Sequence, residues 1–162
     1  MSLAEAFRRV VQALDAAHVD YVVVGSTASA AWGVVRSTRD VDVVLVLPPG
    51  GAAAVLHELI ADDLYVPVAE AAGALERGGS FNVLHPDSGG KVDVFVCLPD
   101  DEFERRRLAR RVPLEVLGMP TFVATAEDVV LSKVRWRKDT RSEVQWRDCV
   151  EIAASQPLDR GY

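Results

Sequence analysis

The chain has 162 residues, of which 49% are hydrophobic and 26% are charged, and its formal net charge is −6. This length and composition fit one globular domain and exclude a disordered chain. The acidic balance also argues against a broad surface that coats nucleic acid, although cationic residues cluster in segments 105–111 and 133–141. Those two clusters leave two alternatives open, local basic grooves or solvated helix faces.

The first twenty residues contain no hydrophobic signal region. No apolar run reaches the roughly 18 residues that a membrane span requires. The two cysteines, Cys97 and Cys149, lie inside apolar patterns, which is typical of buried free thiols. We therefore expect a cytoplasmic protein without a membrane partner.

Hydrophobic periodicity predicts that helices and short strands alternate along the chain. The expected helices cover 3–17, 27–35, 52–63, 100–111, 125–139 and 142–154. The expected strands cover 21–24, 41–47, 81–85 and 91–98, with a hairpin over 112–124. Thr125 and Asp128 have the spacing of a capping box at the start of one helix. The stretch before residue 81, which contains Gly73, Gly78 and Gly79, shows no clear helical or strand periodicity.

This order of elements predicts an α+β fold, a small mixed sheet with helices packed on it and C-terminal helices. Residues 1–124 form the expected core. Residues 125–162 form a C-terminal helical segment that we expect to pack on the core, and the last six residues read as the start of a further helix.

Carboxylates interrupt two of the apolar strands. Asp40 and Asp42 are two positions apart in a strand, so their side chains share one face, and Asp93 opens another strand in the same way. If the strands are neighbours, the three carboxylates converge, and such a cluster can hold two Mg²⁺ ions roughly 3.5–4 Å apart for phosphoryl transfer. Asp93 would then also accept the proton of the attacking hydroxyl. The alternative is a solvated end of an edge strand.

A Gly-Ser pair precedes the first two carboxylates. Gly25 and Ser26 follow a strand and precede a helix, where backbone amides bind anions, and thirteen residues separate Ser26 from Asp40. Taken alone, the pair is typical of an ordinary strand-to-helix turn. Together with the carboxylates it predicts a site that binds a phosphate group.

The sequence resembles nucleotidyltransferases of the DNA polymerase β type in three motifs that occur in the right order: Val24-Gly25-Ser26, Asp40-Val41-Asp42 and the later Asp93. The resemblance implies a polymerase β-like core. It further implies that Gly25 and Ser26 bind the nucleoside triphosphate, that Asp40 and Asp42 bind both metal ions, and that Asp93 completes one metal site.

Within that superfamily the chain most resembles AbiEii-type toxin nucleotidyltransferases. The resemblance is carried by "RSTRDVDVVL", "FNVLHPDSGGKVDVF" and "AEDVVLSKVRW…RSEVQWRDCVEI". It implies that Lys133 contacts the nucleotide phosphates and that Asp148 supports Lys133 or the site. An exposed Lys133–Asp148 ion pair is the alternative. These relatives usually continue further, which implies that this chain is truncated at its C-terminus.

Other residues near the motifs allow two interpretations. Arg36 and Arg39 flank the carboxylates and would neutralise them or clamp the nucleotide phosphates, or would have a purely structural role. The tryptophans at 32, 136 and 146 are expected to be packing residues rather than platforms for bases.

The sequence thus predicts a Mg²⁺-dependent enzyme that transfers a nucleoside monophosphate from a nucleoside triphosphate to a hydroxyl group. The resemblance suggests the 3′ end of a tRNA as acceptor, then a protein side chain, with a cognate toxin or antitoxin as partner. The alternatives are a non-catalytic module that binds a nucleotide or a partner on the same fold, and an antitoxin that acts only by contact.

Overall fold

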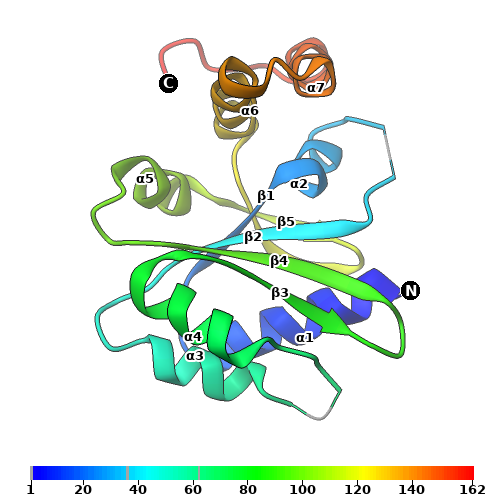
Figure 1. Cartoon of the computed structure of the whole chain (residues 1–162). Coiled ribbons are helices and arrows are strands. Elements are labelled where there is room, and N and C mark those ends of the chain that lie inside the picture. The colour runs from blue at the N-terminus through cyan, green and yellow to red at the C-terminus, as the bar shows by residue number, and fades with distance from the viewer. Residues whose placement is uncertain (1, 36, 62) are drawn as a thin grey trace.

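The computed structural model describes residues 2–35, 37–61 and 63–162 and shows a mixed six-stranded sheet with helices on both faces (Figure 1). The helices are α1 (Ser2–Ala16), α2 (Gly25–Ala31), α3 (Ala52–Leu59), α4 (Val68–Arg77), α5 (Glu102–Arg110), α6 (Ala126–Thr140) and α7 (Glu143–Ser155). The strands are β1 (Tyr21–Val24), β2 (Asp40–Val46), β3 (Gly79–His85), β4 (Gly90–Cys97), β5 (Val112–Val116) and β6 (Met119–Val123). The α+β fold predicted from the sequence is confirmed.

The strands lie in the order β3-β4-β2-β1-β6-β5. β2 pairs in parallel with β4 and antiparallel with β1, and β1 pairs in parallel with β6. Every residue of β1 is buried, because helices cover the centre of the sheet on both sides. β1 and β2 are therefore rigid supports for the residues that follow or interrupt them.

One face of the sheet is covered by α1, α3 and α4 (Figure 1). Helix α1 is amphipathic, and its Phe7, Val10 and Leu14 are completely buried. They pack with residues of β2 such as Val41 and Val43, which point to this side. The hydrophobic core therefore lies mainly on the face opposite the carboxylates.

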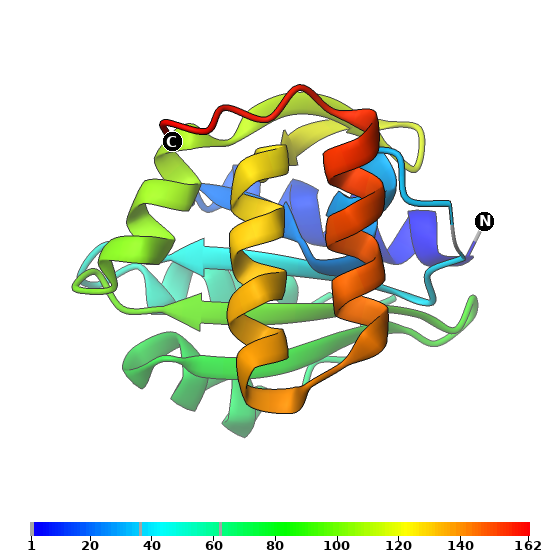
Figure 2. The same ribbon diagram turned by 90° about the horizontal axis from the view of Figure 1, so that it is seen from above.

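The other face carries α2 and α5, with α6 and α7 above them as an antiparallel pair that crosses the strands (Figure 2). Thr125 caps α6 as the sequence predicted, since its side chain accepts a hydrogen bond from the Asp128 amide at 3.1 Å. The Asp128 carboxylate is fully buried and accepts two hydrogen bonds from Arg110. These contacts tie the start of α6 to the end of α5.

The chain end differs from the prediction. The last six residues form no helix but an extended tail, and the hydroxyl of Tyr162 donates to Asp128 at 2.8 Å and lies 2.8 Å from the Thr125 hydroxyl. The guanidinium of Arg110 lies 4.4 Å from the centre of the Tyr162 ring. The tail thus packs on the beginning of α6 instead of continuing as a helix.

Two helices end well before their predicted ends, and one helix was not predicted. Helix α2 begins two residues earlier than expected and ends at Ala31. Two residues later Gly33 has a positive φ of 103°, which only glycine adopts easily. Helix α3 ends at Leu59 rather than at residue 63. Helix α4 was not predicted, because Gly73 interrupts a pattern whose buried residues are Ala71, Ala74 and Leu75.

The cysteines are free thiols, as expected, with Cys149 buried and Cys97 half-buried. Trp32 is a packing residue whose indole donates to the Ala124 carbonyl at 2.8 Å. Trp136 and Trp146 were also expected to be packing residues, but they are 61% and 47% exposed, so that expectation is wrong for them. Among the described residues, no helix combines the length and the hydrophobicity that crossing a membrane requires.

Candidate active site

The register of β2 against β4 brings the three predicted carboxylates together. Asp42 stands opposite Asp93, and Asp40 stands opposite Lys91. Side chains two positions apart in a strand share a face, so all four project to the side covered by α2 and α6. Neighbouring strands are about 4.8 Å apart, which places the carboxylates of Asp42 and Asp93 within reach of one ligand.

Lys91 is a member of this group that the sequence analysis missed. Its ammonium lies 3.2 Å from Asp93 Oδ1 and 3.4 Å from Asp40 Oδ2. Desolvation acts to lower the pKa of Lys91, but the carboxylates of Asp93 and Asp40 outweigh it and raise the pKa above its usual range. Lys91 therefore stays charged and partly neutralises the carboxylates.

Asp42 is the most perturbed carboxyl group of the site. Burial raises its pKa from 3.8 to about 6, and the negative charges of Asp93 and Asp40 add to the rise. The positive charges of Lys91 and Lys133 oppose it. The folded chain thus holds a carboxylate in a place where a cation would stabilise it.

Gly25 is in direct contact with Asp42. Its φ is +67°, and a β-carbon at this position would lie 2.0 Å from Asp42 Oδ2. Helix α2 starts at Gly25, and the Thr27 hydroxyl donates to the Asp40 carbonyl at 3.3 Å, which fixes α2 against the start of β2. Ser26 lines the same cleft as Asp42. Gly25, Ser26 and Asp42 therefore line one cleft, and Asp40 and Asp93 lie beside Asp42 on the same sheet face but are not among the residues that line it.

Lys133 and Asp148 form a buried pair between α6 and α7. The ammonium of Lys133 lies 2.9 Å from Asp148 Oδ2 and donates to Gln145 Oε1 at 2.9 Å. The two side chains are 6% and 3% exposed, so the alternative of an exposed ion pair is wrong. Lys133 also lines the cleft that contains Asp42 and Ser26.

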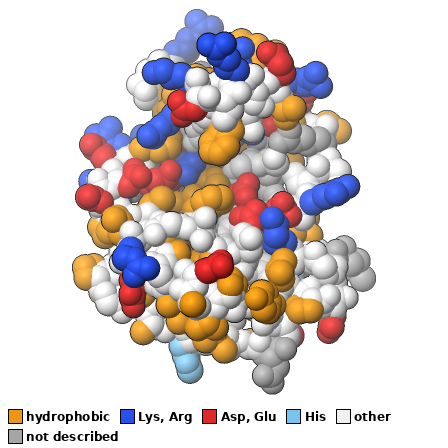
Figure 3. Space-filling model, in the orientation of Figure 1, with side chains coloured by type: hydrophobic (Ala, Val, Ile, Leu, Met, Phe, Trp, Pro, Cys, Tyr) orange, Lys and Arg blue, Asp and Glu red, His pale blue; other side chains and the backbone are white. Residues whose placement is uncertain are grey.

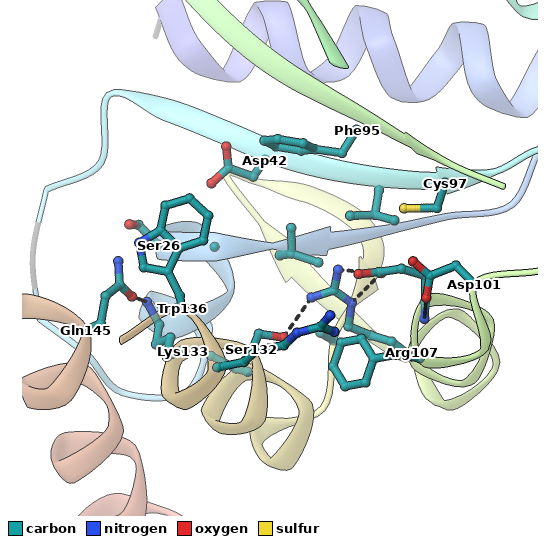
Figure 4. Close-up of a pocket in the computed structure, with 18 of the residues that line it drawn as sticks. Ser26, Asp42, Phe95, Cys97, Asp101, Arg107, Ser132, Lys133, Trp136 and Gln145 are labelled. Carbon is teal, nitrogen blue, oxygen red and sulfur yellow. Dashed lines mark hydrogen bonds and ion pairs between the residues drawn. The ribbon is translucent and has the colours of Figure 1, made fainter. Parts of the chain in front are cut away.

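A cleft of about 520 Å³ runs from this site between the sheet and α6 (Figure 4). Figure 3 shows acidic and hydrophobic side chains gathered between the upper helices and the sheet. The sheet side of the cleft is formed by Val44, Phe95 and Cys97, and Trp136 faces them from α6. Phe95 is 39% exposed and lines the cleft. Neither aromatic residue was predicted to belong to the site.

The far end of the cleft is polar. The buried guanidinium of Arg107 binds Glu104 and donates to the Ser132 hydroxyl at 2.9 Å (Figure 4). Cys97, Asp101 and Glu104 offer ligand atoms that lie within 4.8 Å of one another. Burial and the charges of Glu104 and Asp101 raise the pKa of the Cys97 thiol to about 11, so the free thiol is protonated at neutral pH. This end of the cleft thus offers acidic and sulfur ligand atoms in addition to the cationic Arg107.

The remaining predicted residues have different positions. Arg36, proposed to bind phosphate, lies outside the described residues. Arg39 is exposed at the start of β2. The exposed part of the second cationic cluster lies on α6, where Arg135 lines the cleft.

No protein-family model matches the sequence, and no curated protein matches it. Solved structures do match in fold. An antigenic nucleotidyltransferase-like protein from Paracoccidioides brasiliensis has 18% identity and a TM-score of 0.62 over 94% of this chain and 77% of that one. ANT(2″)-Ia, an antibiotic-resistance factor solved with adenylyl-2″-tobramycin, has 11% identity and a TM-score of 0.56 over 94% and 88%.

A candidate nucleotidyltransferase from Thermotoga maritima has 15% identity and a TM-score of 0.55 over 88% of this chain and 89% of that one. Identities this low show a common fold rather than a common substrate. The narrower resemblance to AbiEii-type toxins stays a prediction. The chain has the fold of nucleotidyltransferases, as its three sequence motifs predicted.

Proposed function

We propose that the protein transfers a nucleoside monophosphate from a nucleoside triphosphate to a hydroxyl acceptor and releases pyrophosphate. The observation that carries the proposal is the register that sets Asp42 opposite Asp93, with Asp40 on the same face and Gly25 against Asp42. ANT(2″)-Ia, which shares the fold, was solved with an adenylylated aminoglycoside, and this supports a hydroxyl group as acceptor.

The carboxylates suit Mg²⁺ as cofactor. Asp40, Asp42 and Asp93 offer hard oxygen ligands. The pKa of Asp42 is raised by burial and further by the charges of Asp93 and Asp40, and a divalent cation would offset both effects. Asp40 and Asp42 would bind both of two ions, and Asp93 would complete one site. When bound, the ions would supply charge stabilisation for the attacking and leaving oxygens.

The cleft would hold the nucleotide. A volume of about 520 Å³ falls in the range of small-molecule sites. Gly25 and Ser26 at the start of α2, with Lys133 on α6, would bind the triphosphate, and Asp148 and Gln145 hold Lys133 in place. Phe95 and Trp136 offer aromatic faces to the base.

The residues of the chain would act mainly by position. Asp93 would accept the proton of the acceptor hydroxyl, because it lies beside Asp42 in the register of two rigid strands. Lys133 would neutralise charge on the phosphates while its own position is fixed by two partners. Catalysis would then come from alignment and charge neutralisation.

We favour the 3′ end of an RNA, such as a tRNA, as acceptor. Segment 134–147 carries five cationic and two acidic side chains, although the whole chain has a net charge of −6. It also exposes Trp136 and Trp146, and the Arg137 guanidinium lies 5.0 Å from the centre of the Trp146 ring. Cationic side chains interleaved with exposed aromatic rings are typical of single-strand binding. A protein side chain is the second candidate, and a cognate toxin or antitoxin would be the partner.

A labelling assay tests the function. The protein, Mg²⁺ and each of the four α-labelled nucleoside triphosphates are mixed with total tRNA and, separately, with cell-extract protein. Asp42→Asn and Asp93→Asn remove site carboxylates, and Asp100→Asn removes an exposed carboxylate outside the cleft as the matched control.

Label on RNA or protein that disappears with Asp42→Asn and Asp93→Asn but persists with Asp100→Asn supports transfer. The same assay identifies the acceptor class and the preferred base. Label that survives loss of Asp42 contradicts the mechanism. Absence of label in every mixture, with nucleotide binding retained, favours the non-catalytic binding module.

A further inference from the structure

The four charged residues at the start of β2 and β4 form a two-by-two arrangement on one sheet face. Asp40 and Asp42 occupy β2, and Lys91 and Asp93 occupy the paired positions of β4. Three negative charges and one positive charge therefore share a small area. In metal-dependent transfer only the carboxylates have an evident task, so the presence of Lys91 requires its own explanation.

The contacts of Lys91 differ from those of an ordinary surface lysine. Its side chain is 32% exposed, and its ammonium lies 3.2 Å from Asp93 Oδ1 and 3.4 Å from Asp40 Oδ2. A lysine at a strand end is free to extend into water, but this one lies between two carboxylates of the site. Its charge therefore offsets their mutual repulsion.

The contact with Asp93 is an ion pair rather than a well-directed hydrogen bond. Among the described residues, Asp93 Oδ1 is buried and has no hydrogen-bond partner of good geometry, although Lys91 Nζ is 3.2 Å away. Such an oxygen keeps lone-pair capacity for another cation. The ammonium of Lys91 is held by the carboxylates of Asp93 and Asp40, so a cation that binds the same carboxylates would compete with it.

We propose that Lys91 is a built-in counter-ion, which holds the carboxylates of Asp40 and Asp93 together in the metal-free protein and competes with the divalent cation for them. The proposal rests on the metal-dependent function proposed above. Lys91 is a positioning residue in this role, because it acts through the carboxylates. It stabilises the metal-free site and at the same time weakens metal binding.

The test compares Lys91→Met with the wild-type protein in two measurements that need no substrate. The first is the melting temperature in EDTA. The second is the affinity for Mg²⁺ and for Mn²⁺, measured by calorimetry without nucleotide. Lys91→Arg retains the charge, and Lys138→Met removes an exposed lysine of α6, outside the ion pairs of the site, as the matched control.

We expect Lys91→Met to melt at a lower temperature in EDTA than the wild type. We also expect it to bind both ions about three- to tenfold more tightly, because a change in affinity of this size corresponds to the loss of one or two partly exposed ion pairs. Added Mg²⁺ should then raise its melting temperature by more than it raises that of the wild type. Lys91→Arg should resemble the wild type in both measurements, and Lys138→Met should not change metal affinity.

Two outcomes overturn the proposal. If Lys91→Met binds the ions no more tightly than the wild type while Asp42→Ala abolishes binding, the metal site exists but Lys91 does not compete for it. If Lys91→Met only melts earlier, its role is structural. A wild-type protein whose Mg²⁺ response equals that of Asp42→Ala instead contradicts the metal-dependent function itself. Should Lys91→Met fail to fold, Lys91→Gln removes the charge but keeps a polar side chain: tighter metal binding than by the wild type supports competition, and equal or weaker binding overturns it.

Discussion

Gly25 and Asp42 are so close that no side chain fits between them. A β-carbon at position 25 would lie 2.0 Å from Asp42 Oδ2, far inside van der Waals contact, and 3.0 Å from its Cγ. The start of α2 is therefore in direct contact with a carboxylate of β2. This contact couples the place proposed for the triphosphate to the place proposed for the metal ions.

Gly25→Ala is expected to lower stability and to abolish transfer. Alanine pays the strain of a positive φ, about 1–2 kcal/mol, and in addition must displace Asp42. Gly89→Ala is a matched control, because Gly89 has a φ of +68° and no atom within 4 Å of an added β-carbon. Denaturant unfolding should show a larger loss for Gly25→Ala than for Gly89→Ala, and only the former should lose label in the transfer assay.

The excess loss can be assigned to Asp42 by a double-mutant cycle. In an Asp42→Gly background the added methyl group at position 25 meets neither the carboxylate nor the β-carbon of Asp42, which lies 3.2 Å from it, so Gly25→Ala should cost about as much as Gly89→Ala. An unchanged excess loss would show that the backbone, and not Asp42, requires glycine at this position.

Asp42→Asn should stabilise the metal-free protein at neutral pH. The pKa of Asp42 is about 6 in the folded chain and ordinarily 3.8, so between these values the folded chain binds more protons and its stability falls as pH rises. We expect Asp42→Asn to raise the free energy of unfolding at pH 7 by about 1–2 kcal/mol, since solvent screens part of the effect. Below about pH 4 the difference should disappear.

The measurement is urea unfolding in EDTA between pH 3.5 and 8, with Asp100→Asn as the control for the loss of an exposed carboxylate. Mg²⁺ should reduce or reverse the advantage of Asp42→Asn, because only the wild type has the full carboxylate set. An Asp42→Asn protein that is less stable than the wild type at pH 7 in EDTA would contradict this account.

Asp148→Ala should be strongly destabilising. It leaves the ammonium of Lys133 buried beside the neutral side chain of Gln145, and loss of one member of a buried pair costs about 3–5 kcal/mol. Lys133→Met in the Asp148→Ala background should recover part of that loss, because the unpaired charge is gone. Thermal and urea unfolding of the wild type and the two variants measure both effects.

The same two helices provide the control. Arg137 and Glu143 also join α6 to α7, but their charged atoms are 3.9 Å apart and their side chains are 40% and 80% exposed. Glu143→Gln should therefore change the free energy of unfolding by less than about 0.5 kcal/mol. Equal costs for Asp148→Ala and Glu143→Gln would show that burial of the Lys133 pair has no energetic weight.

Trp136→Ala should weaken nucleotide binding with little effect on stability. Its ring is 61% exposed and lines the cleft opposite Phe95, and base stacking contributes about 1–3 kcal/mol per ring. We expect the Kd for the preferred nucleoside triphosphate to rise about 5- to 100-fold. Trp146→Ala, at 47% exposure outside the cleft lining, should leave that Kd unchanged and weaken RNA binding. Equal effects of the two variants on the Kd would show that Trp136 does not stack on the base.

The sequence predicted that the three carboxylates lie together. Alternation along a strand places Asp40 and Asp42 on one face, which is a local pattern. The resemblance to nucleotidyltransferases in motif order implied that the strand of Asp93 lies beside theirs, and β4 does pair with β2. Lys91 was missed because a lysine that opens a strand usually reaches into solvent. Only the pairing of β2 with β4 reveals that its two nearest partners are carboxylates of the site.

Other parts depended on packing between distant elements. Arg107 belongs to a cationic segment for which the sequence left a local groove and a solvated helix face both open, and it is buried against Ser132 of α6. Trp136 looked like a core residue, but α6 presents it to the cleft. Helix α4 was not predicted, because Gly73 weakens the intrinsic helix preference of its sequence. In the folded chain, packing of α4 against β3 and α3 compensates for this weak preference.

The parallel pairing of β2 with β4 also has a consequence for how the protein matures. Asp42 and Asp93 lie 51 positions apart, and β4 must enter the sheet between β2 and β3 before they meet. Such long-range parallel contacts form late in folding. A growing chain that has Gly25, Ser26, Asp40 and Asp42 but lacks β4 has only part of its site, so transfer should begin only after the crossover has closed.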